Sequence, residues 1–177
     1  MKLLTATLGC VVCAALLQKA SAAAGALTIQ LPIRYHLEKD RRTWLPQAPL
    51  TNGPVVTIEW TLQGDSIDSW KEMFDVKSIL TKDSVRQHLD IWKSLLIRAD
   101  PKVVVEEQKN ADGGLTVTYS SLAGNEMGIS RYFQDNDGIY ILSYRVRPKS
   151  QNAQILRIWR EIIATATLAP EHVGKRS

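Results

Sequence analysis

Two arginines near the C-terminal end of the sequence, Arg145 and Arg147, are the residues best suited to bind a ligand. Residues 139–147 alternate in the manner of a β-strand, so side chains two positions apart project to the same side. A guanidinium can hold a carboxylate or a phosphate through two parallel hydrogen bonds. If the neighbouring strands keep the same alternation, this face also carries hydroxyl groups, namely those of Thr116, Thr118, Ser130, Tyr132 and Ser143.

We therefore predict a hydroxyl-lined sheet face, edged by the two arginines, that binds an anionic or polyhydroxylated ligand. The alternative is an ordinary solvated sheet face, because threonine and tyrosine are also good strand formers. Arg131 is out of phase with this pattern, since it shares its parity with the apolar Ile129. We interpret it as the sign of a bulge.

Catalytic and metal-binding patterns are missing from the sequence. The histidines His36, His88 and His172 have no i, i+4 or His-x-His spacing, so none is predicted to be a metal ligand or a base. The turn at 135–138 resembles a calcium loop, but Phe133 would occupy its first ligand position, where an oxygen is needed. We predict no catalytic residue, metal or cofactor, and a protein that is not an enzyme. A hydrolase with catalytic groups from separate elements stays open.

The first 22 residues are predicted to form a signal peptide. Lys2 supplies a positive start, residues 3–17 are apolar but too few to span a membrane, and small residues at 20–22 suit a cleavage site. Both cysteines lie in this segment, so the mature chain has no thiol. We expect a periplasmic protein. The alternatives are secretion, or a lipid anchor on Cys10, since residues 8–10 resemble a lipoprotein signal.

Residues 23–169 are predicted to form one domain, and residues 170–177 a flexible tail. Removing the leader takes away two lysines and no acid, so the formal net charge falls from +4 to +2. Such a small charge implies no nucleic-acid partner. No second long apolar stretch follows, which predicts no transmembrane segment after the signal is removed. A chain of this size can bury a single core without disulfides.

Apolar periodicity and turn residues divide the domain into elements. The helix beginning at Val85 is capped by Asp83 or Ser84 and stopped by Asp100 and the proline after it. From residue 102 the period changes to two, and Gly, Asn and Asp separate the apolar runs as hairpin turns do. The predicted elements are strands over 26–31, 33–37 and 56–62, helices over 67–74 and 85–96, strands over 103–108, 115–121, 127–134 and 139–147, and a helix over 155–168.

Short turns between successive strands exclude a doubly wound parallel sheet, which needs a crossover between neighbouring strands. We therefore predict an α+β fold. In it, a mostly antiparallel sheet with a C-terminal four-stranded meander packs against two to three helices.

Two features carry a resemblance to a known family: the segment from Glu59 to Val76, and the closing helix after the strand residues Tyr140 to Tyr144. Together they resemble the PsbP-like and DcrB-like small exported proteins. The resemblance implies a PsbP-like sandwich and a non-catalytic accessory or binding role in the envelope. The predicted partner is an envelope protein or the small anionic ligand that the two arginines suggest. The resemblance transfers no catalytic residue. An NTF2-like small-ligand-binding domain is the rival, although the sequence lacks that fold's long N-terminal helix.

Four of the five tryptophans are in phase with a predicted buried stripe and are expected in the core: Trp60, Trp70, Trp92 and Trp159. Trp44 lies in a stretch without periodicity. We expect it to be either an exposed contact or a plug over one end of the core.

Overall fold

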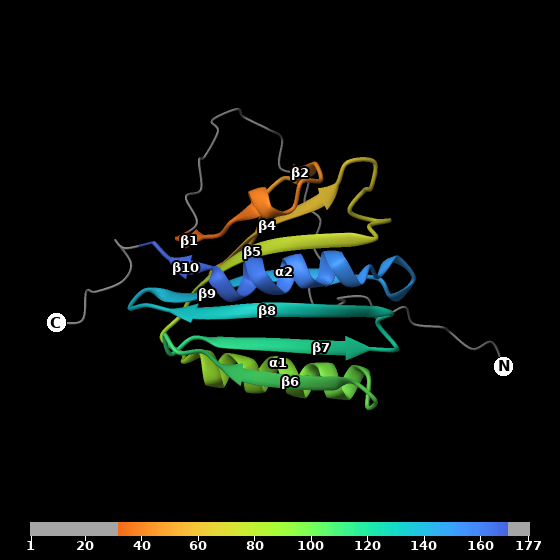
Figure 1. The fold of residues 1–177 in the computed structure, drawn as a ribbon. Helices are drawn as coiled ribbons and strands as arrows, with labels where there is room; N and C mark the ends of the chain where they lie inside the picture. The colour runs from red at the N-terminus through yellow and green to blue at the C-terminus, as the bar shows by residue number, and fades with distance from the viewer. Residues whose placement is uncertain (1–31, 170–177) are drawn as a thin grey trace.

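The structure, a computed structural model, describes residues 32–169 (Figure 1). This part of the chain forms ten strands and two α-helices, α1 (Val85–Ala99) and α2 (Ala153–Thr165). Two short 3-10 turns, Leu37–Lys39 and Pro148–Ser150, complete it. The strands are β1 (Ile33–Arg34), β2 (Trp44–Pro46), β3 (Leu50–Asn52), β4 (Val55–Leu62), β5 (Glu72–Leu80), β6 (Val104–Lys109), β7 (Leu115–Ser121), β8 (Glu126–Gln134), β9 (Gly138–Val146) and β10 (Thr167–Leu168).

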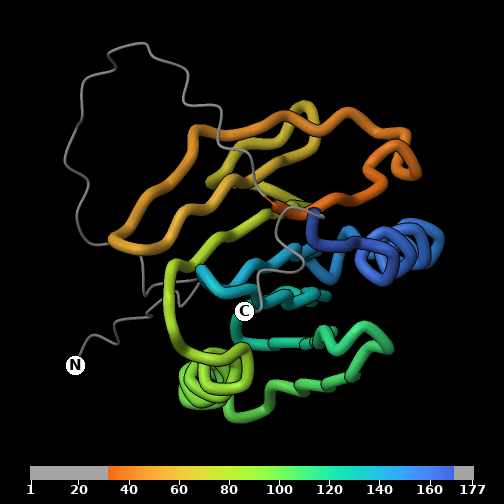
Figure 2. Tube along the Cα trace, turned by 90° about the vertical axis from the view of Figure 1, so that its left-hand side faces the viewer, coloured from red at the N-terminus to blue at the C-terminus, as the bar shows by residue number. Residues whose placement is uncertain are grey.

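One antiparallel sheet dominates the fold, with strand order β2-β4-β5-β9-β8-β7-β6 and with β3 also paired to β4. Strands β1 and β10 form a separate two-stranded ribbon. The two helices lie on opposite sides of the large sheet, as Figure 2 shows in the view along its edge. Helix α2 packs on β8 and β9, and α1 contacts β8 from the other side. Each face of the sheet is therefore covered by one helix over part of its width.

The predicted α+β sandwich with two to three helices is wrong, because the described chain is mainly β-structure. The helix expected over 67–74 is absent, and β5 begins within that span at Glu72. The helix was predicted from the three- and four-residue spacing of Ile67, Trp70 and Phe74, but Ile67 is exposed and only Phe74 lies in the strand. Asp65 accepts a hydrogen bond from the backbone N–H of Lys71 and closes the loop before β5.

Elements with strong local signals are found where they were expected. The meander of β6, β7, β8 and β9 is present, and β4 covers the strand predicted over 56–62. Ser84 caps α1 in a reciprocal capping box with Gln87. Helix α2 begins at Ala153, before the predicted start, because Asn152 accepts the hydrogen bonds of its first turn, and it ends at Thr165, because Thr167 and Leu168 form β10. The strand predicted over 26–31, the leader and the tail at 170–177 lie outside the described residues.

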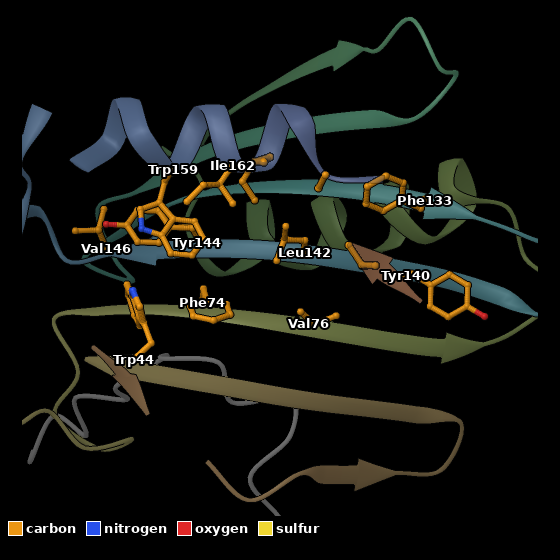
Figure 3. Packing of buried hydrophobic residues seen from close by; sticks show 13 residues of the cluster. Trp44, Phe74, Val76, Phe133, Tyr140, Leu142, Tyr144, Val146, Trp159 and Ile162 are labelled. Atoms are coloured by element: carbon orange, nitrogen blue, oxygen red, sulfur yellow. The ribbon is translucent and has the colours of Figure 1, made fainter. Parts of the chain in front are cut away.

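The larger core lies between α2 and the sheet and is rich in aromatic rings (Figure 3). Trp159 of α2 stacks on Tyr144 of β9 and contacts Trp44 edge to face. Trp44 is buried in β2, so it acts as the plug over one end of the core. Trp60 stacks on Phe74. Trp70, expected in a helical core stripe, lies instead in the loop before β5.

A charged network closes the same end of this core. The buried carboxylate of Asp40 accepts hydrogen bonds from the indole nitrogens of Trp159 (2.8 Å) and Trp44 (3.3 Å). Arg42 donates to Asp40 and to Glu72, and Glu72 also accepts from the hydroxyl of Tyr144. Burial tends to raise the pKa of Asp40, but the hydrogen bonds and charge of Arg42 outweigh it and hold that pKa below its usual range.

A second, smaller core lies between α1 and the other face of the sheet. Leu89 of α1 is fully buried there, and the half-buried Trp92 meets the ring of Tyr119 edge to face. The sheet residues of this core are Ile79, Val117, Tyr132, Ile139 and Ile141. The central strands β5, β8 and β9 therefore contribute apolar side chains to both cores. Within residues 32–169, no helix is long and apolar enough to cross a membrane.

Candidate functional site

The seven predicted site residues do not share one face of the sheet. Five of them, Ser130, Tyr132, Ser143, Arg145 and Arg147, come from β8 and β9 or the residue after β9, and share the parity that faces α1. Thr116 and Thr118 of β7 are on the opposite face. In the β7–β8 pairing they stand beside Arg131 and Ile129, whereas Val117 stands beside Ser130.

The strand register also shows why Arg131 is out of phase with the predicted pattern, which was interpreted as the sign of a bulge. Pairing runs without interruption through this position, so that interpretation is wrong. The guanidinium lies under the end of α2, where it donates to the carbonyl oxygens of Ile163 and Ala164, and it pairs with Asp112. A cation at this place donates to carbonyls of the last helical turn, of which that of Ile163 also accepts from the backbone of Ala166, and it complements the helix dipole. Arg131 is thus a buried cap of α2.

Arg145 is already neutralised inside the protein. Its Nη2 lies 3.1 Å from Glu59 Oε1 and 3.1 Å from Asp75 Oδ2, and all three side chains are largely buried. Burial acts to lower the pKa of Arg145, but the charge of Asp75, with a smaller contribution from Glu59, raises it above the ordinary value. The partners come from β4 and β5, on the side of β9 away from β8. With two carboxylates against one guanidinium, this cluster offers no positive charge for an anion.

Arg147 is held by different contacts. Its guanidinium lies 4.2 Å from the centre of the Trp70 ring, and its Nη1 donates to the carbonyl oxygen of Gly124. Trp70 also lies over Arg145, at 5.6 Å. The tryptophan expected in the core therefore packs against both arginines and joins the loop before β5 to the end of β9.

A groove opens on the other face of the sheet, between α2 and strands β6 to β8. Its volume is about 390 Å³, within the range of small-ligand sites. A second hollow of about 370 Å³ continues over Thr116 and Gln108 and shares Glu106 and Thr118 with the first. Thr116 and Thr118, two residues of the predicted site, therefore line a concave surface. They do so without the other five.

The strand register builds the floor of the groove in rows that cross the strands. The first row runs Val104, Ser120, Met127 and Val146, and the second runs Glu106, Thr118, Ile129 and Tyr144. The hydroxyls of the floor thus come from β7, whereas β8 and β9 supply mainly apolar side chains, and β6 supplies one residue of each kind. Leu156 of α2 adds to the apolar wall. The groove ends at the third row of the sheet. There the buried side chain of Arg131 occupies the position on β8 and fills the space.

Opposite charges stand on the two lips of the groove. Arg160 of α2 is exposed, and its guanidinium has no hydrogen bond or ion pair with any residue between 32 and 169. Glu106 of β6 is exposed on the other lip, and its one polar contact in that range is a long one, 3.5 Å, to the hydroxyl of Thr118. Val104, in the first row, and Leu122, in the turn after β7, are 58% and 72% exposed. Sequence reasoning missed Arg160 and Glu106 because each looks like an ordinary charged surface residue.

Glu106 and Glu107 are the carboxylates that line the two hollows of the groove. None of its lining residues is a histidine. His36 is exposed and bonded to Glu38 at 2.7 Å, whereas His88 lies on α1, where burial first and then the charge of Lys77 lower its pKa. Across residues 32–169 no three acidic, histidine or cysteine side chains gather as metal ligands would. The arrangement is suited to holding a molecule by shape, hydroxyl groups and charge.

No protein-family model matches this sequence, and no curated protein is similar enough to count as a relative. The resemblance to PsbP-like and DcrB-like proteins stays a prediction.

Proposed function

We propose that this protein is an exported, non-catalytic binding protein of the cell envelope, and that its ligand or partner occupies the groove between α2 and β6 to β8. The observation that carries the proposal is the groove itself. It has an apolar floor, a line of half-buried hydroxyls and a cation, Arg160, that no described residue neutralises. Exposed arginine beside apolar surface is typical of recognition sites, because it can form directed hydrogen bonds to an incoming group.

Export is the part of the proposal that rests on sequence. The apolar leader with small residues at its end supports delivery to the periplasm. The resemblance to small exported accessory proteins points to the same compartment. Secretion and a lipid anchor on Cys10 remain the alternatives.

A binding role is preferred to the alternative of a hydrolase with dispersed catalytic residues. Hydrolysis at this groove would need a nucleophile or water with a base in reach. Among the lining hydroxyls, Thr118 meets the carboxylate of Glu106 only at 3.5 Å, too long for an efficient proton transfer, and Ser120 has no polar partner among the described residues. The hydroxyl of Tyr144 is directed away to Glu72 in the buried network.

The proposal is tested by filling the groove. The variant Thr118→Trp places a large ring between β7 and α2, and Thr51→Trp makes the same change on the exposed strand β3 as a matched control. We expect the mature wild-type protein and the control to retain the same specific partner or ligand from the native envelope fraction, and Thr118→Trp to lose it. Circular dichroism must show that both variants are folded. Equal retention by the two tryptophan variants would contradict the proposed site, and turnover of envelope material by the purified protein would favour the hydrolase.

A further inference from the structure

We propose that the occupant of the groove is an extended peptide segment with apolar residues at alternate positions and an acidic residue that meets Arg160. This inference rests on the proposed binding function and names the chemistry of the partner. Three features of the groove support it: the spacing of its hydroxyl groups, the position of its apolar residues and the charges on its lips.

The hydroxyl groups repeat at the spacing of an extended backbone. Thr118 and Ser120 are two residues apart on β7, which places them about 6.6–6.8 Å apart along the strand. An extended peptide presents its N–H and C=O groups to one side at the same repeat. Both hydroxyls are available, since Ser120 has no polar partner among the described residues and Thr118 has only its long contact to Glu106. Thr116 is not available, because it exchanges hydrogen bonds with Asn110.

The apolar residues lie beside this line of hydroxyls at the same repeat. Met127 and Ile129 of β8 stand opposite Ser120 and Thr118, about 4.8 Å away across the ladder, and both are half-buried. In an extended peptide every second side chain faces the same way. A peptide lying along β7 can therefore bond to the hydroxyls with its backbone and place alternate apolar side chains against β8 and Leu156.

The charges of the lips favour a peptide over the other occupants. A simple fatty acid could neutralise Arg160, but it would leave Ser120 without a protein or ligand partner and Glu106 with only its long contact to Thr118. Pairing of β6 with β6 of a second copy is disfavoured, because Glu106 and Glu107 occupy the centre of that strand and would face the same residues of the copy. A peptide offers an acidic side chain to Arg160 and backbone donors to the polar wall.

The direct test is to select peptides from a random linear library displayed on phage, using the folded mature protein as bait. We expect enriched sequences with apolar residues at alternate positions and an acidic residue at a constant distance from them. In fluorescence anisotropy, Arg160→Glu should weaken binding of a selected peptide by about tenfold or more, because a charge-assisted contact becomes repulsive. Arg157→Glu makes the same change at an exposed position of α2 outside the groove lining and should leave the affinity unchanged.

Backbone recognition has its own readout. N-methylation of alternate peptide nitrogens should abolish binding in one register and leave it nearly intact in the other, since only one edge of the peptide faces the hydroxyls of β7. Equal effects in both registers would overturn the extended geometry. Selection by Arg160→Glu should exchange the acidic preference for a basic one, and an unchanged preference would overturn the role of Arg160.

The same measurements separate this inference from the proposed function. If no peptide is enriched, but dodecanoate binds the wild type and Thr118→Trp abolishes its binding, the groove is a binding site and the peptide inference is wrong. If Thr118→Trp retains the native partner, the proposed site itself is wrong. Selected peptides that bind Thr118→Trp and Thr51→Trp equally well would show recognition elsewhere on the protein and would overturn the inference.

Discussion

Replacing Asp40 by alanine should destabilise the protein strongly, because this carboxylate joins the loop before β2 to helix α2. Its side chain is only 1% exposed, and it accepts hydrogen bonds from Trp159, Trp44 and Arg42. No water can reach the indole nitrogen of the fully buried Trp159 without opening the core. Asp40→Ala therefore leaves buried donors without an acceptor.

The magnitude follows from the groups that lose a partner. A buried donor left unsatisfied costs about 1–3 kcal/mol, which applies in full to Trp159 and at the low end to Trp44, whose bond is long. Arg42 is 28% exposed and keeps Glu72 as a partner, so the loss of its ion pair with Asp40 costs about 1 kcal/mol. We expect a total of about 3–5 kcal/mol, the usual range for breaking a buried charged pair.

Urea denaturation followed by far-ultraviolet circular dichroism measures this loss without relying on the tryptophans themselves. Asp68→Ala, at an exposed loop position, is the matched control and should stay within about 0.5 kcal/mol of the wild type. The pKa of Asp40 is lowered by folding, so its contribution is present above the unfolded pKa of about 3.9 and is lost as the pH falls through the folded pKa. The difference between wild type and Asp40→Ala should therefore shrink below about pH 4. A loss under about 1 kcal/mol at neutral pH, or a difference that grows in acid, would refute the reasoning.

Three further outcomes are expected. Arg145→Ser should cost about 3–5 kcal/mol because it leaves two buried carboxylates without a cation, whereas Arg147→Ser should cost less than about 1 kcal/mol; equal denaturation midpoints for the two variants would contradict their different surroundings. Gly128→Ala should cost about 1–3 kcal/mol, because its new Cβ would lie 2.2 Å from the ring of Tyr119, and unchanged near-ultraviolet circular dichroism would show that this ring is not fixed there. Export should yield a mature N-terminus within a few residues of position 23, checked by N-terminal sequencing, whereas membrane-bound material whose processing depends on Cys10 would establish the lipid anchor.

Local signals in the sequence were sufficient for the meander and for the cap of α1. Ser84 caps a helix through Gln87, three residues away, and short polar turns join successive strands, so both depend on neighbours in the chain. The segment at 67–74 was misread because of the three- and four-residue spacing of its apolar residues. Pairing with β4 and β9 on either side made it a strand, and those partners are distant in sequence.

The candidate site was predicted only in part, for a related reason. Alternation shows which residues of one strand share a face, and the parities within β7, β8 and β9 were assigned correctly. It does not show which face is buried when a sheet carries a helix on each side. The parity that was predicted to face the core packs toward α1 in β7 but toward α2 in β8 and β9, so the hydroxyls of Thr116 and Thr118 are separated from those of Ser130 and Ser143.

The sequence by itself determined the strands of the meander, their turns and the positions of both helices, because periodicity, capping and turn chemistry act over a few residues. Only the tertiary structure decided what each charged side chain meets. Arg145 is neutralised by Glu59, which is 86 positions away in the chain, and Trp159 is bonded to Asp40, which is 119 positions away. Arg160 faces the groove because α2 covers one half of a sheet face and leaves the other half open. Such contacts depend on chain closure over long distances, and no local pattern encodes them.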